Sequence, residues 1–293
     1  MSDLFPAEIF NNFKKGALDK ETTIEYLKSY AEIGKCENLR VEAVDYLSKL
    51  CLESDHSYKF LENLLISDSN VEIRSLVAKN IILNCLEECI EAIRWAFLNE
   101  KNVNCLIMIY KALEESNTKD SILLKAEMEV KFANKYIETY NIIPTEAMGL
   151  KFAELSVGTE IVYNDNFNST HHGYTVFEAK NRHVVKLEIV KHNIHSTSFL
   201  NFLSNLECLK LSISNLKYIE NLSNLTNLRY LDLSANFLTE IPGLYSLRNL
   251  KTLKIAWNNI SKLDSFEKLP NLIDIDLSHN LIEPKILSKW HYF

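Results

Sequence analysis

The sequence is poor in the residues that build tight loops, since its 293 residues include only 6 glycines and 5 prolines. Loops that cradle phosphates or dinucleotides need several closely spaced glycines, so this scarcity argues against a nucleotide-dependent enzyme. A basic excess is also missing, because 39 Asp and Glu residues outnumber 32 Lys and Arg residues and give a formal net charge of −7. No nucleic-acid partner is therefore predicted.

Long apolar runs are absent too. The most apolar stretch, residues 77–86, is interrupted by Lys79, Asn80 and Asn84 and is much shorter than the roughly 20 residues that cross a bilayer. The first residues, MSDLFPAEIF, lack the basic and apolar regions of a secretory signal. The six cysteines are dispersed through apolar patterns, which is typical of reduced thiols. We expect no membrane segment and a cytoplasmic location.

Charge is distributed unequally along the chain. Residues 1–143 contain 17 basic and 24 acidic side chains, whereas residues 144–293 contain 15 of each, so the whole imbalance lies in the first half. An acidic half followed by a neutral half predicts two domains.

The second half repeats itself every 22 residues. Apolar residues recur at repeat positions one, four, six and eleven in five segments: VVKLEIVKHNI from Val184, LECLKLSISNL from Leu206, LRYLDLSANFL from Leu228, LKTLKIAWNNI from Leu250 and LIDIDLSHNLI from Leu272. This pattern resembles the leucine-rich repeat, in the short 22-residue class of the regulatory-subunit type, over residues 184–293. The resemblance implies a right-handed solenoid with a parallel concave sheet and short extended or 3₁₀ segments on its convex side.

Position nine of the repeat predicts how the turns are held. It is Asn236, Asn258 and Asn280 in the last three repeats, and an amide side chain there can bond turn backbone groups that would otherwise be buried without partners. The first two repeats have His192 and Ser214 instead, which predicts less regular turns.

Both ends of such a solenoid need a cover, because each exposes a core cross-section and an unpaired strand edge. Two β-like runs, 160–163 and 174–179, precede the first repeat, and a polar turn at 180–183 follows them. We expect the run 174–179 to form a hairpin with the first repeat strand. At the other end, Trp290, Tyr292 and Phe293 are predicted to cover the last leucines.

Residues 1–143 show helical periodicity in eight segments: 6–16, 20–33, 37–53, 57–67, 70–86, 88–99, 103–116 and 120–140. The phrase SDSNVEIRSLVAKNIIL, from Ser67, has Asp68 in a turn before Arg74, and ENLRVEAVDYL places Arg40 in register 34 residues earlier. These phrases resemble the HEAT repeat, which implies an α-solenoid of helix pairs. Pro144 is expected to end this region.

The chain is therefore predicted to be an α+β repeat protein. A HEAT-like helical domain would occupy residues 1–143, a linker and capping hairpin 144–183, and a leucine-rich-repeat domain 184–293. No catalytic motif, metal-ligand spacing or cofactor loop is present in the sequence, and Cys85 and Cys89 are expected to be packed core cysteines. We expect no cofactor and no enzymatic activity.

Because the sequence has no catalytic or cofactor motif, its function is expected to depend on a binding surface. Repeat positions three, five and eight should face or border the concave sheet because they alternate with buried positions. Large aromatic groups ringed by charge are typical of protein-binding hot spots. The predicted partner-binding residues are Ile213, Tyr230, Asp232, Lys254, Trp257, Asp274, Asp276 and His279.

Two simpler interpretations compete with that prediction. Position five alternates in charge through Glu188, Lys210, Asp232, Lys254 and Asp276, which could serve only to pair neighbouring strands. Trp257 could also fold over the flank of its own solenoid.

The favoured function is a non-catalytic adaptor or regulatory subunit that binds another protein on the concave sheet. Similar repeat proteins regulate phosphatases or small GTPases, so the resemblance implies a partner of that kind. The alternative is a subunit of an enzyme assembly such as a prenyltransferase. The α subunit of Rab geranylgeranyl transferase also combines helix pairs with leucine-rich repeats, although the Trp that recurs there occurs here once in the helical half, as Trp95.

Overall fold

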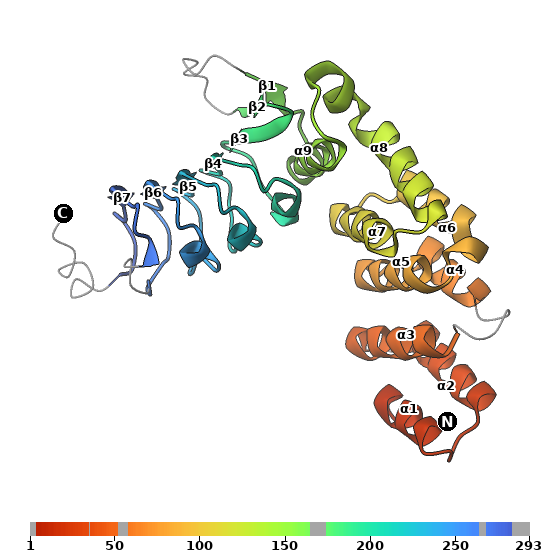
Figure 1. Cartoon of the computed structure of the whole chain (residues 1–293). Helices are drawn as coiled ribbons and strands as arrows, with labels where there is room; N and C mark the ends of the chain where they lie inside the picture. Colours follow the sequence, from red (N-terminus) through yellow and green to blue (C-terminus); the bar gives the residue numbers. More distant parts are fainter. Residues whose placement is uncertain (1–3, 35, 52–57, 165–173, 264–267, 283–293) are drawn as a thin grey trace. The chain divides into compact units, whose positions relative to one another are not determined.

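The computed structural model describes residues 4–34, 36–51, 58–164, 174–263 and 268–282, and these form a helical part followed by a seven-stranded sheet (Figure 1). The chain divides into two compact units, Met1–Met128 and Glu129–Phe293. Trp290, Tyr292 and Phe293, the predicted cover of the last repeat, lie outside the described residues. None of the described helices is long and apolar enough to span a bilayer.

The first unit is an array of helices. The eight segments predicted from periodicity each correspond to a helix: α1 Pro6–Lys14, α2 Lys20–Ile33, α3 Glu37–Cys51, α4 Tyr58–Ser67, α5 Val71–Asn84, α6 Leu86–Asn99, α7 Val103–Ser116 and α8 Lys119–Tyr140, whose residues from Glu129 onward belong to the second unit. Helix α5 packs against both α3 and α7, and α4 packs against α6, so alternate helices form two layers. Cys85 and Cys89 are buried at the start of α6, as expected for core cysteines.

Asparagine and arginine side chains set the turns of this array. Asn70 accepts hydrogen bonds from the first turn of α5, and Asn102 does the same for α7, which satisfies N–H groups that helix starts leave free. Arg74 on α5 forms a two-bond ion pair with Glu100, at 2.8 and 3.0 Å, and Arg40 on α3 pairs with Asp68. The two arginines aligned in the sequence thus bind acidic residues in successive turns.

The second unit contains one more helix than the sequence analysis predicted. Pro144 does not end the helical region, because it occupies the first turn of helix α9, Pro144–Val157. Proline is both a terminator of one helix and a favoured first residue of the next, since its missing N–H would have had no partner there. Residues 144–183, expected as a linker and a hairpin, therefore begin with a fourteen-residue helix.

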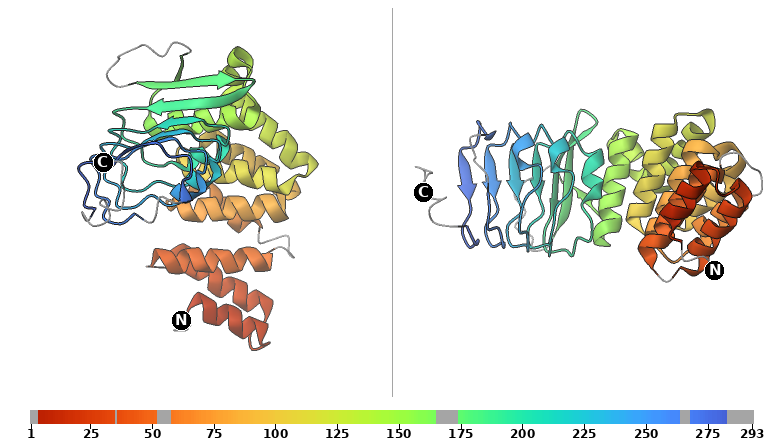
Figure 2. Two further views of the ribbon diagram at one scale, coloured as in Figure 1. Left: turned by 60° about the vertical axis from the view of Figure 1, so that its left-hand side comes forward. Right: turned by 90° about the horizontal axis from the view of Figure 1, so that it is seen from below.

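The seven strands of this unit lie side by side in chain order (Figures 1 and 2). Strand β1, Val162–Tyr163, pairs in parallel with β2, Thr175–Lys180, and β2 is antiparallel to β3, His183–Ile189, as the predicted capping hairpin requires. Four short strands then follow in parallel: β4 Cys208–Lys210, β5 Tyr230–Asp232, β6 Thr252–Lys254 and β7 Asp274–Asp276.

The register of the parallel strands is the predicted 22 residues. Leu187 pairs with Leu209, Leu209 with Leu231, and Leu231 with Leu253, and all four are fully buried. Short 3₁₀ segments lie on the other side of three successive coils, as predicted: η1 Ser198–Phe202, η2 Leu222–Asn224 and η3 Leu244–Ser246. The fold class predicted from the repeat is confirmed.

The position-nine asparagines make the bonds that the sequence predicts. The Oδ1 atom of Asn258 accepts from the N–H of Leu238 at 3.0 Å, and its Nδ2 donates to the carbonyls of Leu233 and Ile255 at 3.0 and 3.1 Å. Asn236 and Asn280 repeat this arrangement. Each amide therefore joins its own turn to the turn of the preceding repeat.

Helix α9 covers the first coil of the solenoid. Buried Glu146 accepts hydrogen bonds from the backbone N–H of Val184 and from Asn205 Nδ2, and it lies 2.9 Å from His183 Nδ1. Gly149 lets the helix approach so closely that an added Cβ would lie 2.8 Å from the Cβ of Phe202. The predicted capping hairpin is thus only part of the cover.

Asn258→Ala is expected to lower the free energy of unfolding by about 2–4 kcal/mol, because it leaves buried backbone groups in two adjacent repeats without partners. The matched control is Asn259→Ala, which changes an exposed residue of the same turn and is expected to cost at most about 0.5 kcal/mol. Urea unfolding followed by circular dichroism measures both values. Equal losses in the two variants would contradict the role assigned to Asn258.

Gly149→Ala is expected to destabilise the protein by about 1–2 kcal/mol, although alanine is the better helix former. The cause is overpacking, since the new methyl group would collide with Phe202 and with Leu203 Cδ2, 2.9 Å away. Urea unfolding shows whether the substitution lowers or raises the free energy of unfolding. A stabilised variant would show that α9 does not pack tightly on the first coil.

Candidate protein-binding surface

The strand register brings the predicted surface positions into rows. Position five forms the row Glu188, Lys210, Asp232, Lys254 and Asp276, and position three forms the row Lys186, Cys208, Tyr230, Thr252 and Asp274. All eight predicted site residues belong to these rows or to the turns that follow the strands. Their degree of exposure separates them into two groups.

The charged row is largely engaged within the protein. Asp232 is buried, lies 3.9 Å from Lys210, and accepts the backbone N–H of Ser234 at 3.0 Å. Asp276 accepts both the N–H and the hydroxyl of Ser278, and these bonds lower the pKa of its carboxyl group. Asp232 therefore fits the interpretation in which the charged row pairs neighbouring strands. Little of its surface is available to a partner.

Tyr230 lies partly buried between these charges. The ammonium group of Lys254 is 6.0 Å from the centre of its ring, within the range of a cation–π contact. Burial and the neighbouring carboxylate of Asp232 raise the pKa of the Tyr230 hydroxyl, so it stays protonated and available as a hydrogen-bond donor. Asp274 is exposed at the end of the same row.

Position eight owes its exposure to the backbone rather than to strand alternation. Strands β4 to β7 end at position five and β3 ends at position six. At position eight every repeat has a left-handed residue, with φ of 64° at Lys191, 56° at Ile213, 56° at Ala235, 58° at Trp257 and 54° at His279. A left-handed residue turns its side chain out of the coil, and isoleucine pays the largest steric penalty there because it is β-branched.

Exposed apolar side chains gather at these turns. Ile213 is 47% exposed and Trp257 is 60% exposed, and Trp257 stacks on His279 with ring centres 3.7 Å apart. Sequence reasoning missed two further members at position ten, Phe237 and Leu281, which are 52% and 66% exposed. We call these four residues, Ile213, Phe237, Trp257 and Leu281, the apolar ridge.

The signal for the missed residues was present in the repeat itself. Position ten is asparagine at 193, 215 and 259, so an apolar residue at 237 and 281 departs from a polar column. The ridge lies along the turns that follow the strands. Backbone hydrogen bonds join these turns from one repeat to the next, since the N–H of Asn236 donates to the carbonyl of Trp257 at 3.1 Å. Trp257 stacks on His279 of the next repeat, so it contacts its own solenoid with one face, and it remains 60% exposed.

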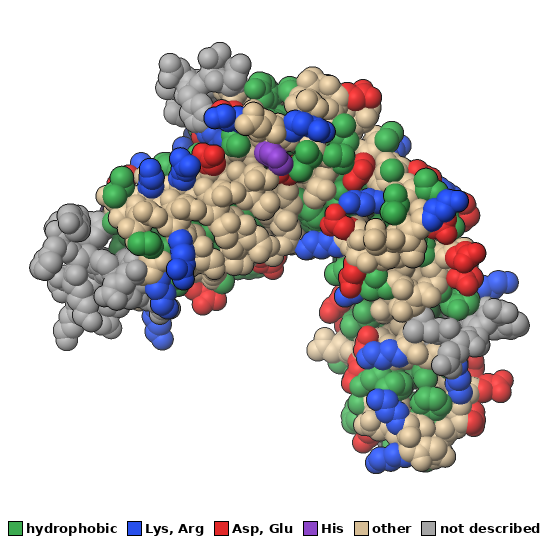
Figure 3. Space-filling view, viewed as in Figure 1, with side chains coloured by type: hydrophobic (Ala, Val, Ile, Leu, Met, Phe, Trp, Pro, Cys, Tyr) green, Lys and Arg blue, Asp and Glu red, His purple; other side chains and the backbone are tan. Residues whose placement is uncertain are grey.

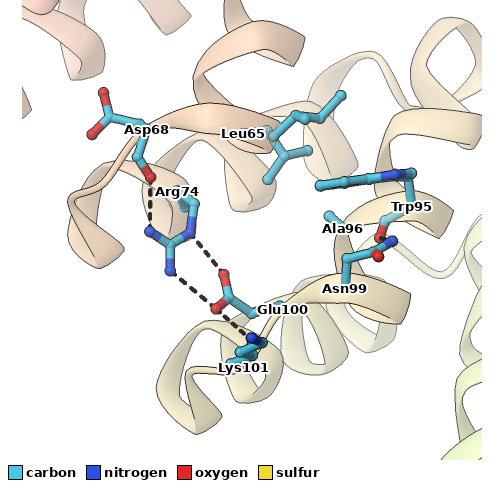
Figure 4. A pocket seen from close by; sticks show the side chains of 9 residues that line it. Leu65, Asp68, Arg74, Trp95, Ala96, Asn99, Glu100 and Lys101 are labelled. Carbon is cyan, nitrogen blue, oxygen red and sulfur yellow. Dashed lines mark hydrogen bonds and ion pairs between the residues drawn. The ribbon is translucent and has the colours of Figure 1, made fainter.

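The helical unit has a surface pocket of its own, with a volume of about 250 Å³ (Figure 4). Its charged side chains are tied together, because Arg74 binds Glu100 and also donates to the carbonyl of Asp68 at 2.8 Å. Trp95 lines the pocket and is 44% exposed. This arrangement fixes the turns around the pocket, and Trp95 and Ile66 are its exposed large apolar side chains.

Comparisons with known proteins bear only on the fold. No family model and no curated protein matches the sequence. Among solved structures, the leucine-rich-repeat ectodomain of a receptor kinase from Arabidopsis thaliana is 22% identical, with a TM-score of 0.39 over 52% of this chain and 90% of that one. An internalin from Listeria monocytogenes is 24% identical, with a TM-score of 0.28 over 34% of this chain and 36% of that one. The leucine-rich-repeat fold of the second unit rests on the register and turns described above.

Ile213→Asn is expected to raise the free energy of unfolding by about 1 kcal/mol, because asparagine adopts a left-handed backbone at a lower steric cost than isoleucine does. The reciprocal change, Asn215→Ile, replaces a residue whose φ is 55° and is expected to lower stability by a similar amount. Urea unfolding of the two variants measures both changes in the free energy of unfolding. A loss of stability in Ile213→Asn would contradict the assignment of strain to this residue.

Proposed function

We propose that the protein is a non-catalytic adaptor or regulatory subunit, which binds another protein through the apolar ridge and the adjacent end of the concave sheet. The observation that carries the proposal is the display of four large apolar side chains at solvent-exposed turns of the solenoid. Exposed tryptophan and its aromatic neighbours are typical centres of protein-binding hot spots.

The charged and polar groups around the ridge supply its rim. His279 stacks on Trp257, and Asp274 and Asp276 lie one strand away from Lys254. A rim of this kind contributes orientation and association rate more than affinity. The partner is proposed to be a globular enzyme such as a phosphatase or a small GTPase, following what the regulatory type of repeat implies.

The helical unit is proposed to be a HEAT-type array. Its support is the pair of arginines, Arg40 and Arg74, which bind acidic residues in successive turns. A cytoplasmic location is proposed as well, and the free thiols of the described cysteines at 36, 85, 89, 105 and 208 support it.

Replacing Trp257 and Tyr230 together by alanine is expected to weaken partner binding at least tenfold, since each removes an aromatic anchor from the proposed interface. The measurement is quantitative recovery of proteins from a host lysate on the immobilised full chain, followed by titration of the recovered protein. Trp95→Ala is the matched control, because it removes an exposed tryptophan from the helical unit. Equal recovery by the wild type and the double variant would contradict the proposed site.

A further inference from the structure

A second surface feature lies at the ends of the strands opposite to those that the apolar ridge follows. It is a polar groove of about 380 Å³, within the size range of ligand pockets, at the points where the repeat strands begin. The ridge follows the ends of those strands, so the two features share no residue. We call it the carboxamide groove after the asparagines that line it.

Its asparagines form a second ladder that the sequence analysis did not use. Asn205, Asn227 and Asn249 line the groove at intervals of 22 residues. Asn249 Nδ2 donates to the carbonyl of Thr226 at 2.9 Å, Asn227 Nδ2 to that of Ser204 at 3.4 Å, and Asn205 Nδ2 to Glu146 Oε1 at 2.8 Å. With the NH₂ group of each amide directed along the solenoid, the oxygen is the acceptor that each side chain can offer to an incoming N–H group.

The groove lining has more cationic than acidic side chains, whereas the whole chain carries a net negative charge. Lys180 and Arg229 line it, exposed Arg182 lies between the lining residues Asn181 and His183, and the backbone N–H of exposed Lys251 donates to the carbonyl of Arg229. Glu207 is the acidic member of the described lining, and it lies 3.8 Å from Arg229 in a half-exposed pair that solvent weakens. On the face seen in Figure 3, Lys and Arg side chains, a histidine and acidic side chains lie along the upper border of the second unit.

We propose that the carboxamide groove binds an extended acidic segment of a partner protein. Carboxylates of the segment would pair with Lys180 and Arg229, and its backbone N–H groups would donate to the asparagine Oδ1 atoms. A single-stranded nucleic acid fits less well, because the described lining residues include no Phe, Tyr or Trp ring on which a base could stack, and the imidazole of His183 is bonded to Glu146 and Asn205. The groove can bind its segment whether or not the apolar ridge has a partner.

The test uses the full chain and a fluorescein-labelled peptide of about ten residues that alternates Glu and Gly, with fluorescence anisotropy as the readout. Lys180→Ala combined with Arg229→Ala is expected to weaken peptide binding at least tenfold. The matched control combines Lys217→Ala with Lys262→Ala, which removes two lysines outside the groove lining and is expected to change binding less than twofold. Binding by the wild type is expected to weaken as salt is raised.

Three outcomes would overturn the proposal. The first is no binding of the peptide by the wild type at millimolar concentration. The second is an equal loss in the groove variant and the control variant, which would reduce the effect to net charge. The third is tighter binding of a single-stranded RNA of similar length than of the peptide, with the same dependence on Arg229, which would assign the groove to nucleic acid. Circular dichroism of both variants shows whether the fold is retained.

Discussion

No single repeat of the second unit can bury its own leucines or pair its own turn, and this dependence on neighbours governs the rest of the structure. The leucines of successive strands are fully buried only because each coil covers the one before it. The amide of Asn258 binds carbonyls in two repeats at once, so backbone pairing is shared across the same boundary. Ends of the array consequently need a cover of different composition.

The cover at the first coil explains why the helix α9 exists. A hairpin strand pairs the edge of β3 but leaves the leucines behind the sheet open. Helix α9 fills that space, with Phe152 and Phe202 in contact at 5.3 Å between ring centres, and Glu146 takes the place of a preceding coil as the acceptor for Asn205. The ladder of asparagine amides thus ends on a buried carboxylate.

The sequence predicts what repetition dictates and misses what occurs once. The strand register, the role of Asn236, Asn258 and Asn280, and the capping strand all follow from a period that is visible without a structure. Pro144 is ambiguous by itself, because the same residue ends one helix and begins another. The partners of Arg40 and Arg74 depend on how neighbouring helices stack, which no local pattern specifies.

At position eight of the candidate site, side chains are exposed because the backbone is left-handed there, and not because residues alternate along a strand. The inward turn of each position-nine side chain requires a left-handed residue just before it, so position eight must point outward in every repeat. Asparagine or glycine would satisfy that geometry at low cost, yet the chain has Ile213 and Trp257 there. Backbone strain at a position where a residue of lower cost would also fold is typical of functional sites, and it supports a binding role for the ridge.

The same architecture lets one solenoid present two chemistries. Because each column of the repeat forms a separate row, apolar residues at positions eight and ten lie at one edge, while carboxamides and cations lie at the other. Apolar contact supplies most of the affinity in protein complexes, whereas ionic contact supplies orientation and a faster encounter. Keeping the two rows apart allows either to change by single substitutions without disturbing the buried leucines that hold both in place.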